Sequence, residues 1–147
     1  MSSKIKEVYK KDATINNIHM SWGWDLPATD IDCLFVEYNY PNNPAALIEY
    51  KHQNWNRDFT KGPIRTIHAL ANKADLPFFV VIWNNKPEVT FEIYCMNNQA
   101  RSQHLDYNVF LKVLENKELV KEAQQITEKQ YIDFMTFIRR QKNDTIS

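Results

Sequence analysis

The sequence predicts an α/β (α+β) fold in which a mixed central sheet is flanked by helices. Apolar runs of strand length are separated by turn residues, and one segment of helical periodicity, residues 63–73, lies between two of these runs. The 147 residues match the size of one domain, and neither a repeat nor a linker divides them. We therefore expect a single domain over residues 1–147, with a core over about residues 1–96 and a C-terminal helical elaboration over about residues 105–142.

The first third of the chain is expected to hold a helix, a hairpin and two paired strands. Apolar residues at helical spacing predict a helix over residues 3–11, and the polar and aromatic residues 16–24 predict a hairpin. Residues 32–40 and 45–51 are strand-like, and the Pro-Asn-Asn-Pro sequence that separates them is typical of a turn. These two strands are therefore expected to pair antiparallel.

A crossover helix and two further strands are expected next. Residues 63–73 place apolar side chains on one helical face, and Pro63 suits the first turn. The continuous apolar run at residues 76–83 is typical of a strand that is buried on both faces, so we expect it at the centre of the sheet. Residues 90–96 alternate in polarity and can pair with it.

The C-terminal part of the chain is expected to be helical, over about residues 106–116 and 127–141. The second helix opens with Thr127 and Gln130 at the spacing of a capping box, in which the two side chains bind each other's backbone N–H groups. Its apolar positions recur at helical spacing and include Phe134. This pattern predicts a helix that packs against the rest of the domain.

Composition and charge limit the classes of function. The 44% hydrophobic and 13% aromatic residues are typical of a folded protein. Eighteen basic residues balance eighteen acidic ones, so any binding to nucleic acid must come from a local patch. No apolar run reaches the roughly 18 to 20 residues of a membrane span, and the first residues lack the apolar core of a signal peptide. We therefore expect a cytoplasmic protein without a membrane partner.

The cysteines and histidines do not predict a zinc site. Cys33 and Cys95 lie in apolar, strand-like runs rather than in a C-x-x-C pair, so both are expected to be buried free thiols. The four histidines are scattered and lack the spacing of zinc ligands; they are His19, His52, His68 and His104.

The spacing of Glu49 and Lys51 indicates a candidate site for chemistry on one face of a strand. Residues two apart in a strand point to the same face, so this carboxylate and this ammonium group are expected to lie side by side. Asp30 and Asp32 open the strand that should pair with theirs, which would bring one of them close to Glu49. Two carboxylates from neighbouring strands can bind Mg²⁺ or Mn²⁺ together with waters and a phosphate oxygen.

This arrangement resembles the PD-(D/E)xK nuclease superfamily. The resemblance rests on an Asp at the head of one strand, a turn, and then Glu-x-Lys after small and apolar residues (Ala-Ala-Leu-Ile-Glu-Tyr-Lys, residues 45–51), and it covers residues 1 to about 96. It implies a restriction-endonuclease-like, or Holliday-junction-resolvase-like, αβββαβ core. It also implies that an Asp and Glu49 hold Mg²⁺ or Mn²⁺, and that Lys51 serves the attacking water.

The resemblance leaves the identity of the Asp ligand open. The residue before each candidate is Thr or Ile rather than the Pro of the motif; we prefer Asp32 because the apolar run begins directly after it, and keep Asp30 as a supporting ligand. Some members of the superfamily add an acidic ligand from the first helix, and Glu7 is the glutamate available there. Gln53 continues the alternation of Glu49 and Lys51 and is therefore included among the catalytic residues.

Contacts to DNA are expected from basic residues that flank the crossover helix and from one tryptophan near the site. The basic side chains would hold the phosphate backbone by charge, and the indole would stack on a base. These residues are Lys61, Arg65, Lys73 and Trp55.

The expected function is a Mg²⁺-dependent or Mn²⁺-dependent endonuclease that acts on DNA rather than RNA. Its small size is typical of phage or mobile-element nucleases, such as junction resolvases, and similar small members often form homodimers. The alternative is a catalytically inactive module on the same fold that binds nucleic acid or protein. A third interpretation is an interaction protein with an unrelated α+β fold, in which Glu49 and Lys51 are a solvated pair and the aspartates form turns.

Overall fold

The computed structural model describes residues 31–37 and 43–146, which all belong to the unit Ile31–Ser147. The helix expected over residues 3–11 and the hairpin expected over residues 16–24 lie outside the described residues. The elements in chain order are β1 (Cys33–Glu37), β2 (Asn43–His52), α3 (Gly62–Ala74), β3 (Phe78–Asn84), β4 (Thr90–Cys95), α4 (Asn98–Phe110), the π-helical segment η2 (Leu111–Glu115), β5 (Ile126–Thr127) and α5 (Glu128–Ile146).

The five strands form one mixed sheet in which the spatial order equals the chain order, β1-β2-β3-β4-β5. The pairs β1–β2, β3–β4 and β4–β5 are antiparallel, whereas β2 and β3 are parallel. A parallel pair needs a crossover connection, and α3 supplies it. The predicted α+β class, the mixed sheet and the central place of β3 are therefore confirmed.

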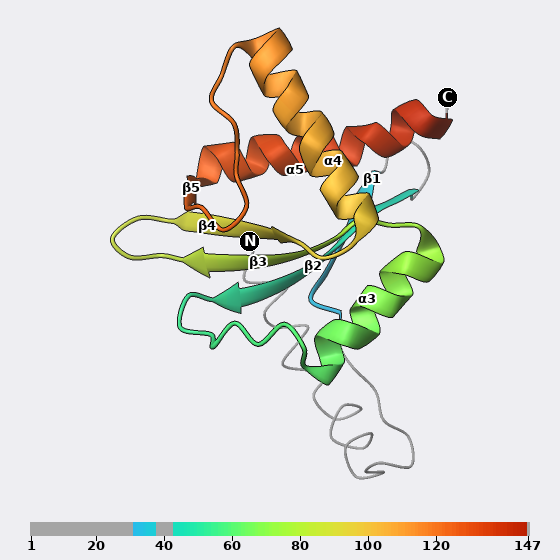
Figure 1. Cartoon of the computed structure of the whole chain (residues 1–147), viewed down its shortest axis with the longest axis vertical. Helices are drawn as coiled ribbons and strands as arrows, with labels where there is room; N and C mark the ends of the chain where they lie inside the picture. The colour runs from blue at the N-terminus through green and yellow to red at the C-terminus, as the bar shows by residue number, and fades with distance from the viewer. Residues whose placement is uncertain (1–30, 38–42, 147) are drawn as a thin grey trace, which may run out of the picture. The chain divides into compact units, whose positions relative to one another are not determined.

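Each face of the sheet is covered by helices, α3 on one side and α4 and α5 on the other (Figure 1). Strand alternation divides the apolar side chains between two cores. The core under α3 contains Leu47, Ile64, Ile67, Ala71, Leu76, Phe78 and Val80. The larger core under α4, η2 and α5 includes Ala46, Ile48, Phe79, Val81, Ile93, Tyr107, Phe134 and Ile138.

Two helix ends follow from local sequence chemistry. Pro63 lies at the start of α3, as predicted, and Asp75 ends that helix in the left-handed conformation with φ 56°. At the start of α5, the Thr127 hydroxyl accepts the N–H of Gln130 at 3.1 Å, and the Gln130 side chain accepts the N–H of Thr127 at 2.8 Å. The predicted capping box is therefore confirmed.

Helix α4 begins at Asn98 rather than at about residue 106, because Asn97 caps it. The buried Asn97 amide oxygen accepts the N–H groups of Ala100, at 2.9 Å, and Phe78, at 3.1 Å. Its amide nitrogen donates to the carbonyl of Leu76 at 2.8 Å. One side chain thus fixes the start of α4 and the start of β3 together, which explains why a weakly amphipathic segment is helical.

Two further features were not predicted. Strand β5 has only two residues, Ile126 and Thr127, and is too short to produce a periodic pattern. The thiol of Cys33 is half-buried rather than buried, while Cys95 is buried as expected, and both cysteines are free.

Among the described residues, no helix combines the length and the apolar character that a membrane span requires.

Helix α5 packs against the sheet through the larger core, and the contribution of this packing to the free energy of unfolding can be measured. Phe134 is fully buried, and its ring contacts those of Phe79 and Tyr107 at centroid distances of 5.4 and 5.1 Å. We expect Phe134→Ala to lower the free energy of unfolding by about 3–5 kcal/mol in urea titrations, because it removes an aromatic ring and leaves a cavity. The control Ile132→Ala, on the exposed face of the same helix, should change it by no more than about 0.5 kcal/mol. A loss below about 1 kcal/mol for Phe134→Ala would contradict the docking of α5 on the sheet.

Candidate active site

The register between β1 and β2 brings Asp32 and Glu49 together. Cys33 pairs with Ile48 in this antiparallel pair, so Asp32 lies opposite Glu49 on the neighbouring strand. Opposed residues of an antiparallel pair share a face of the sheet. The Oδ2 atom of Asp32 also accepts the N–H of Tyr50 at 3.1 Å, which holds the carboxylate against β2.

The carboxyl group of Glu49 is buried and perturbed. Its side chain is among the few buried charged groups of the described residues, at 4% exposure. The pKa of Glu49 is raised from its usual 4.5 to about 8; burial is the largest cause, the hydrogen bond and negative charge of Asp32 add to it, and the charge of Lys51 acts in the opposite direction. A hydrogen bond between two carboxyl groups requires a proton on one of them, so the pair holds one proton at neutral pH.

Lys51 lies on the same face of β2 as Glu49, as the alternation predicts. Its Nζ atom lies 5.5 Å from the centroid of the Trp55 ring, within the range of a cation–π contact. Because its charge acts on the Glu49 carboxyl group, the ammonium group lies within electrostatic reach of the acidic pair. Asp32, Glu49 and Lys51 therefore form a mixed-charge cluster across β1 and β2.

The segment after β2 is folded back onto the sheet by Arg57, a residue that the sequence did not single out. The Arg57 guanidinium donates to the carbonyls of Gln53, at 3.1 Å, and Trp55, at 3.2 Å, and it pairs with Glu92 on β4 at 3.0 Å. A hydrogen bond with Tyr94 and the charge of Glu92 raise the pKa of Arg57. Arg57 itself has a left-handed backbone, with φ 59°. These contacts fix the turn that carries Trp55 beside Lys51.

Aromatic packing supports the same segment. The rings of Trp55 and Phe59 meet edge to face at 5.0 Å, and Phe59 lies 5.0 Å from Tyr94 on β4. These side chains pack against the smaller core, which lies under α3. Trp55 is therefore partly buried, with its ring between Lys51 and Phe59, rather than free on the surface.

The remaining predicted residues fall into three groups. Gln53 is held through its main chain, whose N–H donates to the Trp83 carbonyl at 2.9 Å and so continues the β2–β3 ladder by one residue. Lys61 occupies the N-cap position of α3 without a side-chain capping hydrogen bond, and Arg65 lies in the first turns of the helix. Lys73 lies in the last turn at the opposite end, where it complements the helix dipole. All three are exposed. Asp30 and Glu7 lie outside the described residues.

Comparison of the chain with family models, with curated proteins and with solved structures gave no significant match. The chemistry of the site is therefore argued from its own residues. Two carboxylate groups offer hard oxygen donors, a neighbouring ammonium group offers positive charge, and the first turns of α3 carry two exposed basic side chains. This combination suits a divalent cation and a phosphate ester better than it suits an uncharged ligand.

The raised pKa of Glu49 predicts a pH dependence of stability. The folded state binds the Glu49 proton more tightly than the unfolded state does, so the stabilisation is fully present below pH 4.5 and is lost as the pH rises towards about 8. We expect the free energy of unfolding, measured with a chelator present, to fall across this window by up to about 1.4 kcal/mol per pH unit from this group.

Glu49→Gln should flatten this part of the profile, because an amide does not titrate. Glu88→Gln makes the same change of charge at an exposed position between β3 and β4, and it should leave the profile unchanged. Equal slopes for the wild type and Glu49→Gln would show that the acidic pair does not hold the extra proton.

Proposed function

We propose that this chain is a metal-dependent endonuclease of the PD-(D/E)xK type that hydrolyses phosphodiester bonds in DNA. The observation that carries the proposal is the contact between Asp32 and Glu49 across β1 and β2, with Lys51 two residues along the same strand face. A buried acid next to a second acid is costly unless a proton or a cation neutralises the pair. The Glu-x-Lys spacing places the ammonium group beside that cation position.

The donor set fits Mg²⁺ or Mn²⁺. Asp32 and Glu49 would hold the ion with carboxylate oxygens, and Asp30 and Glu7 remain the candidates for a further ligand. When bound, the ion supplies positive charge against the phosphate and promotes ionisation of water. Lys51 would orient the attacking water and neutralise negative charge that grows on the phosphate oxygens in the transition state. Gln53 is the candidate for a supporting contact to the water or the phosphate.

The fold is compatible with this assignment. The order β1, β2, α3, β3, with an antiparallel pair followed by a parallel crossover, matches the corresponding part of the αβββαβ order expected for a restriction-endonuclease-like core. Glu49 and Lys51 lie within β2, whereas Asp32 directly precedes β1 and Gln53 directly follows β2. The strand holds Glu49 and Lys51 at a fixed spacing, and the hydrogen bond from the Tyr50 N–H holds Asp32 against the same strand.

The phosphate backbone would be held near the start of α3. Lys61 and Arg65 lie there, directly after the segment that carries Trp55, and both are exposed. The net charge of the chain is zero, so a local cluster of this kind is needed to attract DNA. Trp55 is the candidate for stacking on a base, because its ring already lies beside Lys51.

A second candidate function is a catalytically inactive binding module on the same fold. The observation in its favour is that Asp32 accepts a backbone N–H from Tyr50 and shares a proton with Glu49, so the pair can stabilise the β1–β2 contact without any ion. Metal binding separates the two functions, because only the nuclease requires it.

The primary test is cleavage of labelled single-stranded, duplex, flapped and four-way-junction DNA, with an RNA strand for comparison, in Mg²⁺ or Mn²⁺. We expect cutting of DNA by the wild type, and a loss of at least about 100-fold in Asp32→Asn, Glu49→Gln and Lys51→Met, because each variant removes a cation ligand or a charge that acts in the transition state. Glu88→Gln is the matched charge control. If the folded wild-type protein cuts none of these substrates and Mn²⁺ calorimetry detects no binding that depends on Glu49, the binding module is the better explanation.

DNA affinity should depend on salt through the basic residues of α3. We expect Lys61→Ala and Arg65→Ala each to reduce the slope of log affinity against log salt by about 1, because each removes one phosphate contact. Lys73→Ala tests how far the DNA contact extends along α3. Its effect on the slope should be smaller, because Lys73 lies in the last turn of the helix. Lys129→Ala, on α5, is the negative control. An unchanged slope in Lys61→Ala and Arg65→Ala would place the DNA elsewhere.

A further inference from the structure

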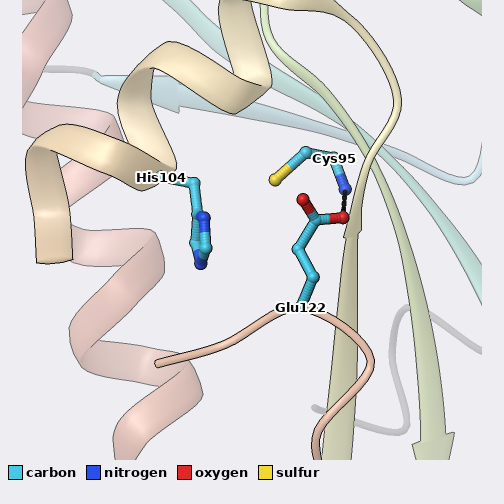
Figure 2. Close-up of side chains that lie close together, drawn as sticks. All are labelled: Cys95, His104 and Glu122. Atoms are coloured by element: carbon cyan, nitrogen blue, oxygen red, sulfur yellow. Dashed lines mark hydrogen bonds between the residues drawn. The ribbon is translucent and has the colours of Figure 1, made fainter. Parts of the chain in front are cut away.

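Three side chains with different donor atoms meet on the face of the sheet opposite to Glu49. Cys95 ends β4, His104 lies within α4, and Glu122 lies in the segment between η2 and β5; Figure 2 shows the three side chains turned towards one another. The thiol sulphur, a ring nitrogen and a carboxylate oxygen all lie within 4.8 Å of one another. Among the described residues, no other group of three His, Cys, Asp or Glu side chains meets this geometry.

The segment that carries Glu122 is fixed on both sides of this cluster. Glu122 Oε2 accepts the N–H of Cys95 at 3.0 Å, and the next residue, Ala123, donates its N–H to the Ile93 carbonyl at 3.2 Å. On the other side, His104 Nε2 lies 2.5 Å from the carbonyl oxygen of Val120. The carboxylate is therefore held next to β4 and α4 by contacts that do not use the donor atoms of the thiol or of the second ring nitrogen.

The backbone contact of His104 leaves one ring nitrogen free to bind a metal. A carbonyl oxygen can only accept, so the contact with Val120 requires the hydrogen of His104 on Nε2. This leaves the lone pair on Nδ1 available. Ligating histidines usually donate their other ring N–H to a carbonyl or a carboxylate, and this fixes both the tautomer and the direction of the ring.

A catalytic Cys-His-Glu triad is a less suitable interpretation of the same residues. In a triad, the acid orients the histidine, but Glu122 bonds to the backbone of Cys95 and the ring N–H of His104 bonds to the backbone of Val120. Cys95 is also buried, with 8% of the residue exposed, so access for a substrate is small.

We propose that Cys95, His104 and Glu122 bind one zinc ion, which joins β4, α4 and the η2–β5 segment. The combination of a sulphur, an imidazole nitrogen and a carboxylate oxygen is typical of zinc and differs from the oxygen-only sets that Mg²⁺ prefers. Three protein ligands leave the fourth tetrahedral position to water. The proposal is independent of the nuclease function, because it uses the other face of the sheet and other residues.

The spacing of the cluster is close to that of a zinc site. Ligand–zinc distances of about 2.0–2.3 Å place neighbouring tetrahedral donors about 3.6 Å apart. A cluster spread over at most 4.8 Å must therefore contract by about 1 Å. Glu122 can provide its part of this movement, because it is exposed and has a long, rotatable side chain; the distance between Cys95 and His104 must adjust through their own side-chain torsions.

The test is titration of the full chain, after removal of metal by a chelator, with Co²⁺ as a spectroscopic substitute for zinc. We expect one equivalent to bind, a thiolate-to-cobalt charge-transfer band to appear together with the d–d bands of a tetrahedral site, and Zn²⁺ to displace the cobalt. Zn²⁺ should also raise the Tm of the metal-free protein. Cys95→Ser should abolish the charge-transfer band, and His104→Gln and Glu122→Gln should weaken zinc binding by at least about 10-fold.

The chain offers matched controls. Cys33→Ser removes the other cysteine and His68→Gln removes a histidine on α3, and both should bind zinc as the wild type does. Glu122→Gln keeps an oxygen that can accept the Cys95 N–H, and the residue is exposed, so this variant should fold even if Cys95→Ser does not. Glu49→Gln should also retain zinc binding, which separates this proposal from the nuclease site.

The proposal is overturned if the charge-transfer band persists in Cys95→Ser or disappears only in Cys33→Ser. It is also overturned if Zn²⁺ raises the Tm of Glu122→Gln as much as that of the wild type. Unchanged Mg²⁺-dependent cleavage by Glu122→Gln is expected, since the zinc ligands have no part in the phosphodiester chemistry.

Discussion

The register between β1 and β2 is the constraint on which the candidate active site depends. Because side chains alternate along a strand, a shift of one residue would move Asp32 to the face opposite Glu49 and separate the acidic pair. The apolar residues of β2 oppose such a shift: Leu47 is buried in the core under α3, and Ile48 is buried in the core under α5. The same burial that stabilises the sheet therefore sets the distance between the two carboxyl groups.

Strand β3 supports both faces of the sheet from its centre. It pairs in parallel with β2 and antiparallel with β4, and its residues 78–82 are buried on both faces. Asn97 then ties the start of β3 to the start of α4 through backbone hydrogen bonds. This connection fixes the helix that presents His104 relative to the strand that presents Cys95, so the two proposed ion sites share one scaffold although they lie on different faces.

The two sites also share one electrostatic feature. Glu49 lies beside Asp32, and Cys95 lies beside Glu122; in both pairs, burial is the main cause of the raised pKa of the first group, and the acidic neighbour adds to it. A buried acidic group next to another must keep its proton or acquire a cation. The donor atoms explain why a different cation is proposed for each site. The first pair offers only oxygen, which suits Mg²⁺ or Mn²⁺, whereas the second cluster adds sulphur and nitrogen, which suit zinc.

Local sequence by itself determined the common face of Glu49 and Lys51 and the capping box of Thr127 and Gln130, because each depends on residues only a few positions apart. Only the tertiary structure placed Asp32 opposite Glu49, joined Arg57 to Glu92 and gathered Cys95, His104 and Glu122. Contacts of this second kind depend on strand register and on the docking of helices. Strand register and helix docking are decided by burial over the entire domain, and they leave no periodic pattern in the sequence.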